Sequence, residues 1–251
     1  MSRIAAFLGW VAVTAALGTA AALTERLPGD LTATVWLQEH ARGLDGVMRA
    51  ASAAGDLLPA AGVMVLAALG LYCRGQRAYA LALPALAVTA LAIPVLKTLV
   101  ERPRPSADLV QVLIEEGGYS FPSGHALGMA LAMGAVICLA RPLCGKQTWL
   151  VWPLRMAAAA AALTVGVARA YLGVHWTSDV LGGFLLGGLA LFAGVLLYQE
   201  IAASGRRVGK GGGEAKGSKA GTAKGRKGES EGKRKRGDHA ASPSPGTHHR
   251  R

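Results

Sequence analysis

The stretch Ile4–Leu23, IAAFLGWVAVTAALGTAAAL, decides the class of fold, because it runs for 20 residues without a charged side chain. A helix needs about 20 predominantly apolar residues to cross the hydrocarbon core of a bilayer. Five further runs with few or no charges follow along the chain. The six predicted spans cover residues 4–24, 57–73, 78–96, 124–140, 150–169 and 180–198. The sequence therefore predicts an all-α polytopic membrane protein, with six transmembrane helices forming a bundle in residues 1–200.

The first span has a second interpretation as a secretory signal, since Ala20-Ala21-Ala22 could serve as a cleavage site. Its apolar run is longer than the usual signal core, and only Arg3 precedes it. We favour a retained anchor. Cleavage would leave the topology of the other five spans unchanged.

Net charge divides the chain into two parts. Residues 1–200 carry 13 Lys+Arg and 11 Asp+Glu, a net charge of +2, whereas residues 201–251 carry 14 and 4, a net charge of +10. The second part is rich in Gly, Lys and Ser and has no aromatic residue, so we expect a disordered tail. Its run Lys233-Arg234-Lys235-Arg236 suits anionic lipid headgroups, although a merely solvated tail is the simpler interpretation. We expect no nucleic-acid partner.

The distribution of basic residues orients the bundle only when the tail is counted. Before residue 201, the two faces of the predicted bundle would expose six and seven basic residues. The five basic residues that closely follow the last span change this count to eleven against seven. We therefore expect both termini in the cytoplasm, with the loops 97–122 and 170–179 on the outer face of the membrane.

Ionisable residues gather at the ends of the last four predicted spans. Such residues at membrane depth are costly and are functional candidates by default. The chain crosses the membrane away and back between the second and third groups, so all the groups would emerge at one face. Cations and histidines together predict an anion site, with phosphate as the obvious ligand. The groups are Lys97, Arg102 and Arg104; His125; Arg169; and His175 with Asp179.

The segment Pro122-Ser123-Gly124-His125 immediately precedes an apolar span. Ser123 is a good N-cap, and Gly124 permits close approach of the backbone. The N–H groups at a helix N-terminus bind phosphate. Taken alone, the segment is also a common way for a loop to enter a helix.

His175 and Asp179 are four residues apart, so on a helix they would share a face. The carboxylate would then hold one ring nitrogen and leave the other free to attack phosphorus. The plain alternative is an interfacial histidine beside a helix-capping aspartate.

These motifs together resemble the tripartite signature of the type 2 phosphatidic acid phosphatase superfamily. The first is Lys97, six residues, then Arg104-Pro105; the second is Pro122-Ser123-Gly124-His125; the third is Arg169, five residues, His175, three residues, Asp179. That superfamily includes integral membrane lipid phosphatases and soluble vanadium haloperoxidases. The membrane-embedded body of this chain favours the first group.

The resemblance implies a role for each matched residue. His175 would be the nucleophile that forms a phosphohistidine, and Asp179 would bond its other nitrogen. His125 would protonate the leaving lipid oxygen and later help water to attack. The resemblance implies that no metal or other cofactor is needed, and that the phosphoryl oxygens are held by Lys97, Arg104, Ser123, Gly124 and Arg169.

Three further positions carry expectations. Ala168 stands where the family pattern often has Ser, whose hydroxyl would add a hydrogen bond to phosphate or a neighbour, worth about 1 kcal/mol. Arg102 is expected to be a supporting or headgroup contact, since the spacing from Lys97 selects Arg104. The apolar side chains of loop 106–121 are expected to form a lid or an acyl-chain entrance.

The resemblance therefore implies metal-independent hydrolysis of a lipid phosphomonoester or diphosphate at the extracytoplasmic membrane face. Two alternatives stay open. One is a phosphotransferase that passes the same phosphohistidine to a lipid or sugar hydroxyl. The other is a non-catalytic lipid-binding or transport protein of the same fold. The sequence does not identify the lipid.

Overall fold

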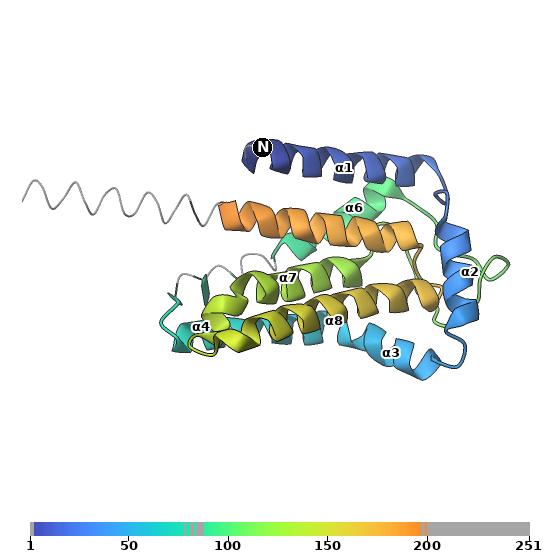
Figure 1. Cartoon of the computed structure of the whole chain (residues 1–251). Helices are drawn as coiled ribbons and strands as arrows, with labels where there is room; N and C mark the ends of the chain where they lie inside the picture. Colours follow the sequence, from blue (N-terminus) through green and yellow to red (C-terminus); the bar gives the residue numbers. More distant parts are fainter. Residues whose placement is uncertain (1–2, 78, 81–82, 84–87, 197–198, 200–251) are drawn as a thin grey trace, which may run out of the picture. The chain divides into compact units, whose positions relative to one another are not determined.

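The computed structural model describes residues 3–77, 79–80, 83, 88–196 and 199, all within one unit, Met1–Gln199. Among these residues every regular element is a helix, which confirms the all-α class (Figure 1). The predicted tail, residues 201–251, lies outside the described residues. So does much of the first half of the predicted span 78–96.

The helices follow one another along the chain, and the longest connection within the described residues is the loop between α6 and α7 (Figure 1). The last described helix, Thr177–Leu196, is drawn in orange without a label and is called helix 177–196 below. The other elements are α1 (Arg3–Leu23), α2 (Asp30–His40), α3 (Asp45–Ala54), α4 (Leu57–Cys73), η1 (Val88–Ala92), α6 (Ile93–Val100), α7 (Gly124–Cys144), η2 (Thr148–Leu150) and α8 (Val151–Tyr171).

Four helices in the described part of the chain are long and apolar enough to cross a membrane. They are α1, α7, α8 together with the turn before it (Thr148–Tyr171), and helix 177–196. They correspond to the first, fourth, fifth and sixth predicted spans. The second predicted span coincides with α4, which forms a fifth candidate only as half of a broken span with α3, bent by 53°. Four or five of the six predicted spans are therefore supported.

The packing around α7 sets the position of the helix start that carries His125. Helix α7 contacts both α4 and α8. A Cβ at Gly183 would lie 2.5 Å from the carbonyl oxygen of Ser123, and one at Gly187 would lie 2.8 Å from that of Leu127. Glycine at these two positions lets helix 177–196 approach the start of α7, as small residues do between membrane helices.

Helix α2 crosses the end of the bundle at which α8 ends and helix 177–196 begins (Figure 1). Between α1 and α4 the chain forms two short helices, α2 and α3. They are separated at residues 41–44, where Gly43 has a φ of 84°. Few residues other than glycine adopt this left-handed conformation without strain. The break allows α3 to turn back and pack on α8.

Candidate active site

Three segments meet at the end of α8. They are the loop between α6 and α7, the last turn of α8, and the start of helix 177–196. Backbone hydrogen bonds join them: Leu113 donates to the carbonyl of Leu172 at 3.0 Å, and Ser123 donates to the carbonyl of Asp179 at 3.1 Å. The structure thus brings Arg104, Arg169, His175 and Asp179 together, as their positions at the span ends predicted.

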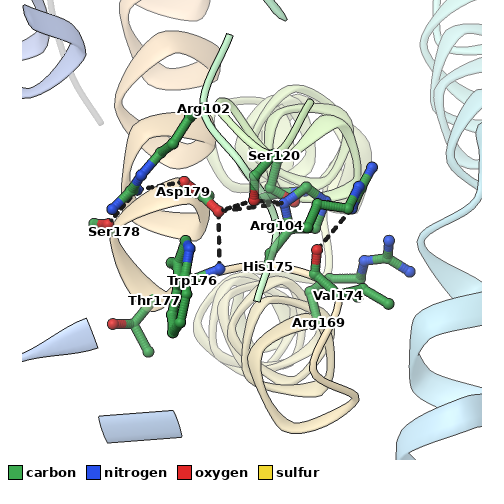
Figure 2. Close-up of polar contacts among 12 residues, drawn as sticks. Arg102, Arg104, Ser120, Arg169, Val174, His175, Trp176, Thr177, Ser178 and Asp179 are labelled. Carbon is green, nitrogen blue, oxygen red and sulfur yellow. Dashed lines mark hydrogen bonds and ion pairs between the residues drawn. The ribbon is translucent and has the colours of Figure 1, made fainter. Parts of the chain in front are cut away.

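His175 and Asp179 are both buried and lie close together, but not on one helix face (Figure 2). Helix 177–196 begins two residues after His175. The Asp179 carboxylate folds back over the helix start and accepts from the backbone N–H of Trp176 at 2.8 Å. Its Oδ2 lies 3.6 Å from Nδ1 of His175, within ion-pair range and beyond an ordinary hydrogen bond. The expected shared helix face is therefore wrong, because the carboxylate caps the helix.

The imidazole of His175 is neutral near pH 7. Burial lowers the pKa of His175 to about 4, although the Asp179 carboxylate acts in the opposite direction. Nη1 of Arg104 lies 3.4 Å from Nε2 of His175. Since a guanidinium only donates, this contact suits a ring whose Nε2 carries a lone pair and whose Nδ1 carries the proton. That tautomer leaves Nε2 as the nucleophilic atom.

Ser120 is a site residue that the sequence analysis missed. Its hydroxyl is buried and donates to Oδ2 of Asp179, and its oxygen lies 3.5 Å from Nδ1 of His175 (Figure 2). It precedes the Pro122 motif by two residues and belongs to none of the three motifs. Only the path of the loop places it at the His175–Asp179 pair.

Arg102 supports the carboxylate of Asp179 from the side away from the histidine. Its Nη1 lies 2.6 Å from Oδ1 of Asp179, and its Nη2 lies 2.7 Å from Oδ2 of Asp30 in α2. The supporting role expected from the sequence is thus present. The alternative, a contact with a lipid headgroup, is wrong because the Arg102 side chain has no exposed surface.

Asp30 is a second residue that sequence reasoning missed. It is buried, and it accepts hydrogen bonds from the hydroxyl and the backbone N–H of Ser178 at 2.7 and 2.9 Å. Burial alone would raise the pKa of Asp30, but the hydrogen bonds from Ser178 hold that pKa below its usual value. Asp30 is therefore a charged partner for Arg102.

A single carboxylate, that of Glu116, pairs with both arginines of the site. Its Oε2 lies 3.2 Å from Nη1 of Arg104, and its Oε1 pairs with Nη2 of Arg169. Burial would raise the pKa of Glu116, but Arg169 and Arg104 hold that pKa below its usual value, so the group is ionised. No sequence motif indicated this contact, although the loop contains two adjacent glutamates, Glu115 and Glu116.

Arg169 has one buried N–H donor that is unpaired among the described residues. It is buried in the last turn of α8, and its Nη1 donates to the hydroxyl of Ser52 at 2.8 Å. Its Nε is also buried and has no hydrogen-bond partner among the described residues. A buried unpaired N–H of a cation is costly and suits an anionic ligand.

Lys97 adds a third cation to the site. It lies in the last turn of α6. Burial and then the nearby charge of Arg104 lower the pKa of Lys97 below its usual value. Arg104 itself is held in place by the carbonyl oxygens of Val174 at 2.6 Å and Gly118 at 3.1 Å. The site thus gathers three cations around the Glu116 carboxylate.

A cleft of about 400 Å³ opens beside Arg104 and Glu116. Its walls combine the charged groups with apolar side chains of loop 106–121, the loop that was expected to form an entrance. The lining residues are Arg104, Pro105, Val112, Ile114, Glu115, Glu116, Gly117, Gly173 and Val174.

The second motif forms the start of α7. Ser123 is the N-cap, as predicted: its hydroxyl oxygen accepts from the backbone N–H of Ala126 at 3.4 Å, and its side chain is buried. Gly124 is the first residue of the helix. His125 points toward the bend before α4, where its Nε2 lies 2.7 Å from Oδ1 of Asp56. The roles of these three residues toward phosphate stay predictions.

Curated relatives of the chain are proteins named as lipid phosphatases. Phosphatidylglycerophosphatase B of Bacillus subtilis is 39% identical over 101 residues, which cover 39% of this chain and 47% of that protein. Undecaprenyl-diphosphatase of Sulfolobus acidocaldarius is 40% identical over 78 residues, covering 31% and 32%. Lipid A 4'-phosphatase of Bacteroides thetaiotaomicron is 35% identical over 114 residues, covering 41% and 44%. The chain thus spans less than half the length of each of these relatives.

A solved structure extends the likeness to most of the fold. It is the crystal structure of a transmembrane PAP2-type phosphatidylglycerolphosphate phosphatase from Bacillus subtilis. The TM-score is 0.56 at 27% identity, with 79% of this chain and 96% of that chain covered. The model of the PAP2 superfamily matches residues 78–202, which include all three motifs. The chain is therefore an integral membrane protein that belongs to the PAP2 superfamily.

Proposed function

We propose that the chain is a lipid phosphate phosphatase that hydrolyses a phosphomonoester or a diphosphate of a membrane lipid. The names of its relatives specify phosphatidylglycerophosphate, undecaprenyl diphosphate and the 4'-phosphate of lipid A. These molecules share a terminal phosphoryl group on a lipid, and that group is the proposed substrate.

One observation carries the proposal: an anionic group, the Glu116 carboxylate, lies between Arg104 and Arg169, next to a neutral buried histidine. A phosphoryl group carries more charge and more acceptor oxygens than a carboxylate, so it would compete well for the same donors. The unpaired Nε of Arg169 supplies one more donor for it.

In the proposed first step, Nε2 of His175 attacks phosphorus and the bond to the leaving lipid oxygen breaks. Protonated His125 gives its proton to that oxygen. The imidazole of His175 becomes positively charged, and Asp179 stabilises this charge. The three cations, Lys97, Arg104 and Arg169, stabilise the charge on the phosphoryl oxygens without a metal ion.

In the second step, neutral His125 takes a proton from water, and the water oxygen attacks the phosphorus of the phosphohistidine. The bond between phosphorus and nitrogen breaks, and its electron pair returns to Nε2 of His175. Inorganic phosphate leaves, and both histidines regain their starting protonation states. Ser123 and Gly124, at the N-terminus of α7, would bind the phosphoryl oxygens through the helix end.

We further propose that the site faces the extracytoplasmic side of the cytoplasmic membrane, with both termini in the cytoplasm. The support is the excess of basic residues near the end of the last span. A basic tail over residues 201–251 would then lie beside the anionic inner leaflet.

The test is release of phosphate by the purified full chain, with EDTA present, from phosphatidate, phosphatidylglycerophosphate, undecaprenyl diphosphate and sphingoid phosphates. The His175→Ala variant should lose nearly all activity. The exposed His40, which stacks on Trp36, provides the matched control His40→Ala. Unchanged release from His175→Ala would overturn the mechanism. Phosphorylation of an added alcohol, with little free phosphate, would instead indicate a phosphotransferase.

A further inference from the structure

The bend between α3 and α4 brings residues from outside the matched family segment to the site. The two helices meet at 53°, and the residues at the bend, Ser52, Gly55 and Asp56, precede the matched segment, which begins at residue 78. None of them belongs to the three motifs. Their contacts nevertheless reach two residues of the proposed machinery.

The first contact is with a phosphate-binding arginine. The hydroxyl of Ser52 accepts from Nη1 of Arg169 at 2.8 Å, and Ser52 is buried. The second contact is with the proposed acid: Oδ1 of Asp56 lies 2.7 Å from Nε2 of His125. One turn of chain therefore contacts both residues.

Gly55 makes this close approach possible. A Cβ at Gly55 would lie 2.4 Å from Cγ1 of Val165 and 3.3 Å from Cδ2 of His125. Any larger residue would push the bend away from α8 and from the imidazole. The glycine therefore sets the distance over which Asp56 meets His125.

We propose that Asp56 is a positioning residue for His125, forming a second carboxylate–imidazole pair beside that of Asp179 and His175. The inference rests on the proposed function. The Asp56 carboxylate accepts a hydrogen bond from the Nε2–H group of His125. This bond fixes the orientation of the ring and directs Nδ1 toward the substrate.

The proton balance follows from this orientation. His125 in its charged form carries protons on both nitrogens. The Nε2 proton stays on the bond to Asp56, and the Nδ1 proton moves to the leaving lipid oxygen as the bond to phosphorus breaks. The Nδ1 lone pair then takes a proton from water in the second step. The charges of Arg169 and Glu116 also act on His125, but Asp56 is the residue that contacts its ring directly.

The dependence of the reaction rate on the leaving group distinguishes a positioning role of Asp56 from a merely structural one. An alkoxide leaving group needs a proton as it departs, whereas 4-nitrophenolate needs little help. The experiment measures single-turnover formation of phosphohistidine in the full chain, for wild type and Asp56→Asn, with a short-chain phosphatidate and with 4-nitrophenyl phosphate. We expect at least about a tenfold loss of rate with phosphatidate, and less than about a threefold change with the aryl ester.

A matched control is available on the same helix pair. Asp45, at the start of α3, accepts a hydrogen bond from the Tyr171 hydroxyl at 2.5 Å. Within the described part of the chain, no hydrogen bond or ion pair joins Asp45 to His125 or Arg169. Asp45→Asn should leave both rates within about twofold of wild type. Asp56→Glu, which keeps the carboxylate, should recover part of the rate with phosphatidate.

Three results for Asp56→Asn would overturn the inference. Equal losses with both substrates would mean that Asp56 only maintains the fold. Unchanged rates would mean that it is not used, and faster rates would mean that it competes with substrate for His125. Failure of the proposed function is distinct, since the wild-type chain would then form no phosphohistidine from either substrate.

Discussion

Arg102 and Asp179 form an ion pair of 2.6 Å in which neither side chain has exposed surface. The arginine occupies one carboxylate oxygen, Oδ1, and leaves Oδ2 for Ser120, the Trp176 N–H and His175. On its other side it pairs with Asp30. Arg104 thus lies at the proposed phosphate site, while Arg102, two residues earlier, holds the Asp179 carboxylate in one orientation beside His175.

Arg102→Met should destabilise the protein by about 3–5 kcal/mol, because Asp30 and Asp179 would remain buried without their partner. The measurement is denaturant unfolding in detergent. Arg42, which is exposed in the turn after α2, provides the control Arg42→Met, expected to change stability by less than about 0.5 kcal/mol. A loss below about 1 kcal/mol for Arg102→Met would contradict the role assigned to the pair.

Glu116→Gln should strengthen binding of inorganic phosphate by about three- to tenfold, because phosphate would no longer displace a charged group from Arg104 and Arg169. The measurement is the inhibition constant of phosphate against lipid hydrolysis. The exposed Glu39 of α2 gives the control Glu39→Gln, which should leave that constant unchanged. Weaker binding in Glu116→Gln would indicate that the carboxylate orders the arginines instead of competing with the ligand.

The folded state should lose stability on mild acidification, because His175 is buried in its neutral form. Its pKa falls from 6.5 to about 4 on burial, so the unfolded chain binds the proton more tightly than the folded chain between these values. Stability is therefore retained above pH 6.5 and decreases as the pH falls toward 4, by about 2 kcal/mol between pH 7 and pH 5.

The measurement compares unfolding of wild type and His175→Gln at pH 7 and pH 5. The variant lacks this titrating group, so its loss between the two pH values should be smaller by about that amount. An equal loss in both proteins would show that the imidazole is not buried in its neutral form.

Ala168→Ser should not raise turnover, although the family pattern often has Ser there. Ala168 is buried in an apolar cluster with Met48, Tyr171 and Leu172. A hydroxyl placed there would enter that cluster, at a cost of about 1 kcal/mol in stability, and kcat should stay within about twofold. The measurement is kcat and unfolding of the same preparation. A clear gain in kcat would mean that the hydroxyl does reach the phosphate, as the sequence had suggested.

The sequence by itself determined the class of fold and the residue types of the site. Runs with few or no charges, long enough to cross a bilayer, predicted α1, α7, α8 and helix 177–196 within a few residues at each end. A bilayer requires each spanning segment to be apolar along its own length, so this pattern is visible in the sequence without any knowledge of the tertiary structure. The spacing of the motifs likewise pointed to Arg104, Arg169, His175 and Asp179, which the structure brings together.

The local geometry at His175 was less predictable. The expectation of a shared helix face assumed that the helix already contains His175, whereas it begins at Thr177. The side chain of Asp179 caps that helix start and reaches back to the histidine. A helix boundary that moves by two residues changes the direction of every side chain beside it, and sequence patterns fix such boundaries poorly.

Only the tertiary structure decided the partners of the site. Asp30 contacts Ser178 from 148 residues away, Asp56 contacts His125 from 69 residues away, and Arg169 contacts Ser52 from 117 residues away. Each contact depends on a bend, a loop path or a glycine approach far from the motifs. Hydrogen bonds and ion pairs act only within a few ångströms, so residues so far apart in the chain meet only after the helices have packed.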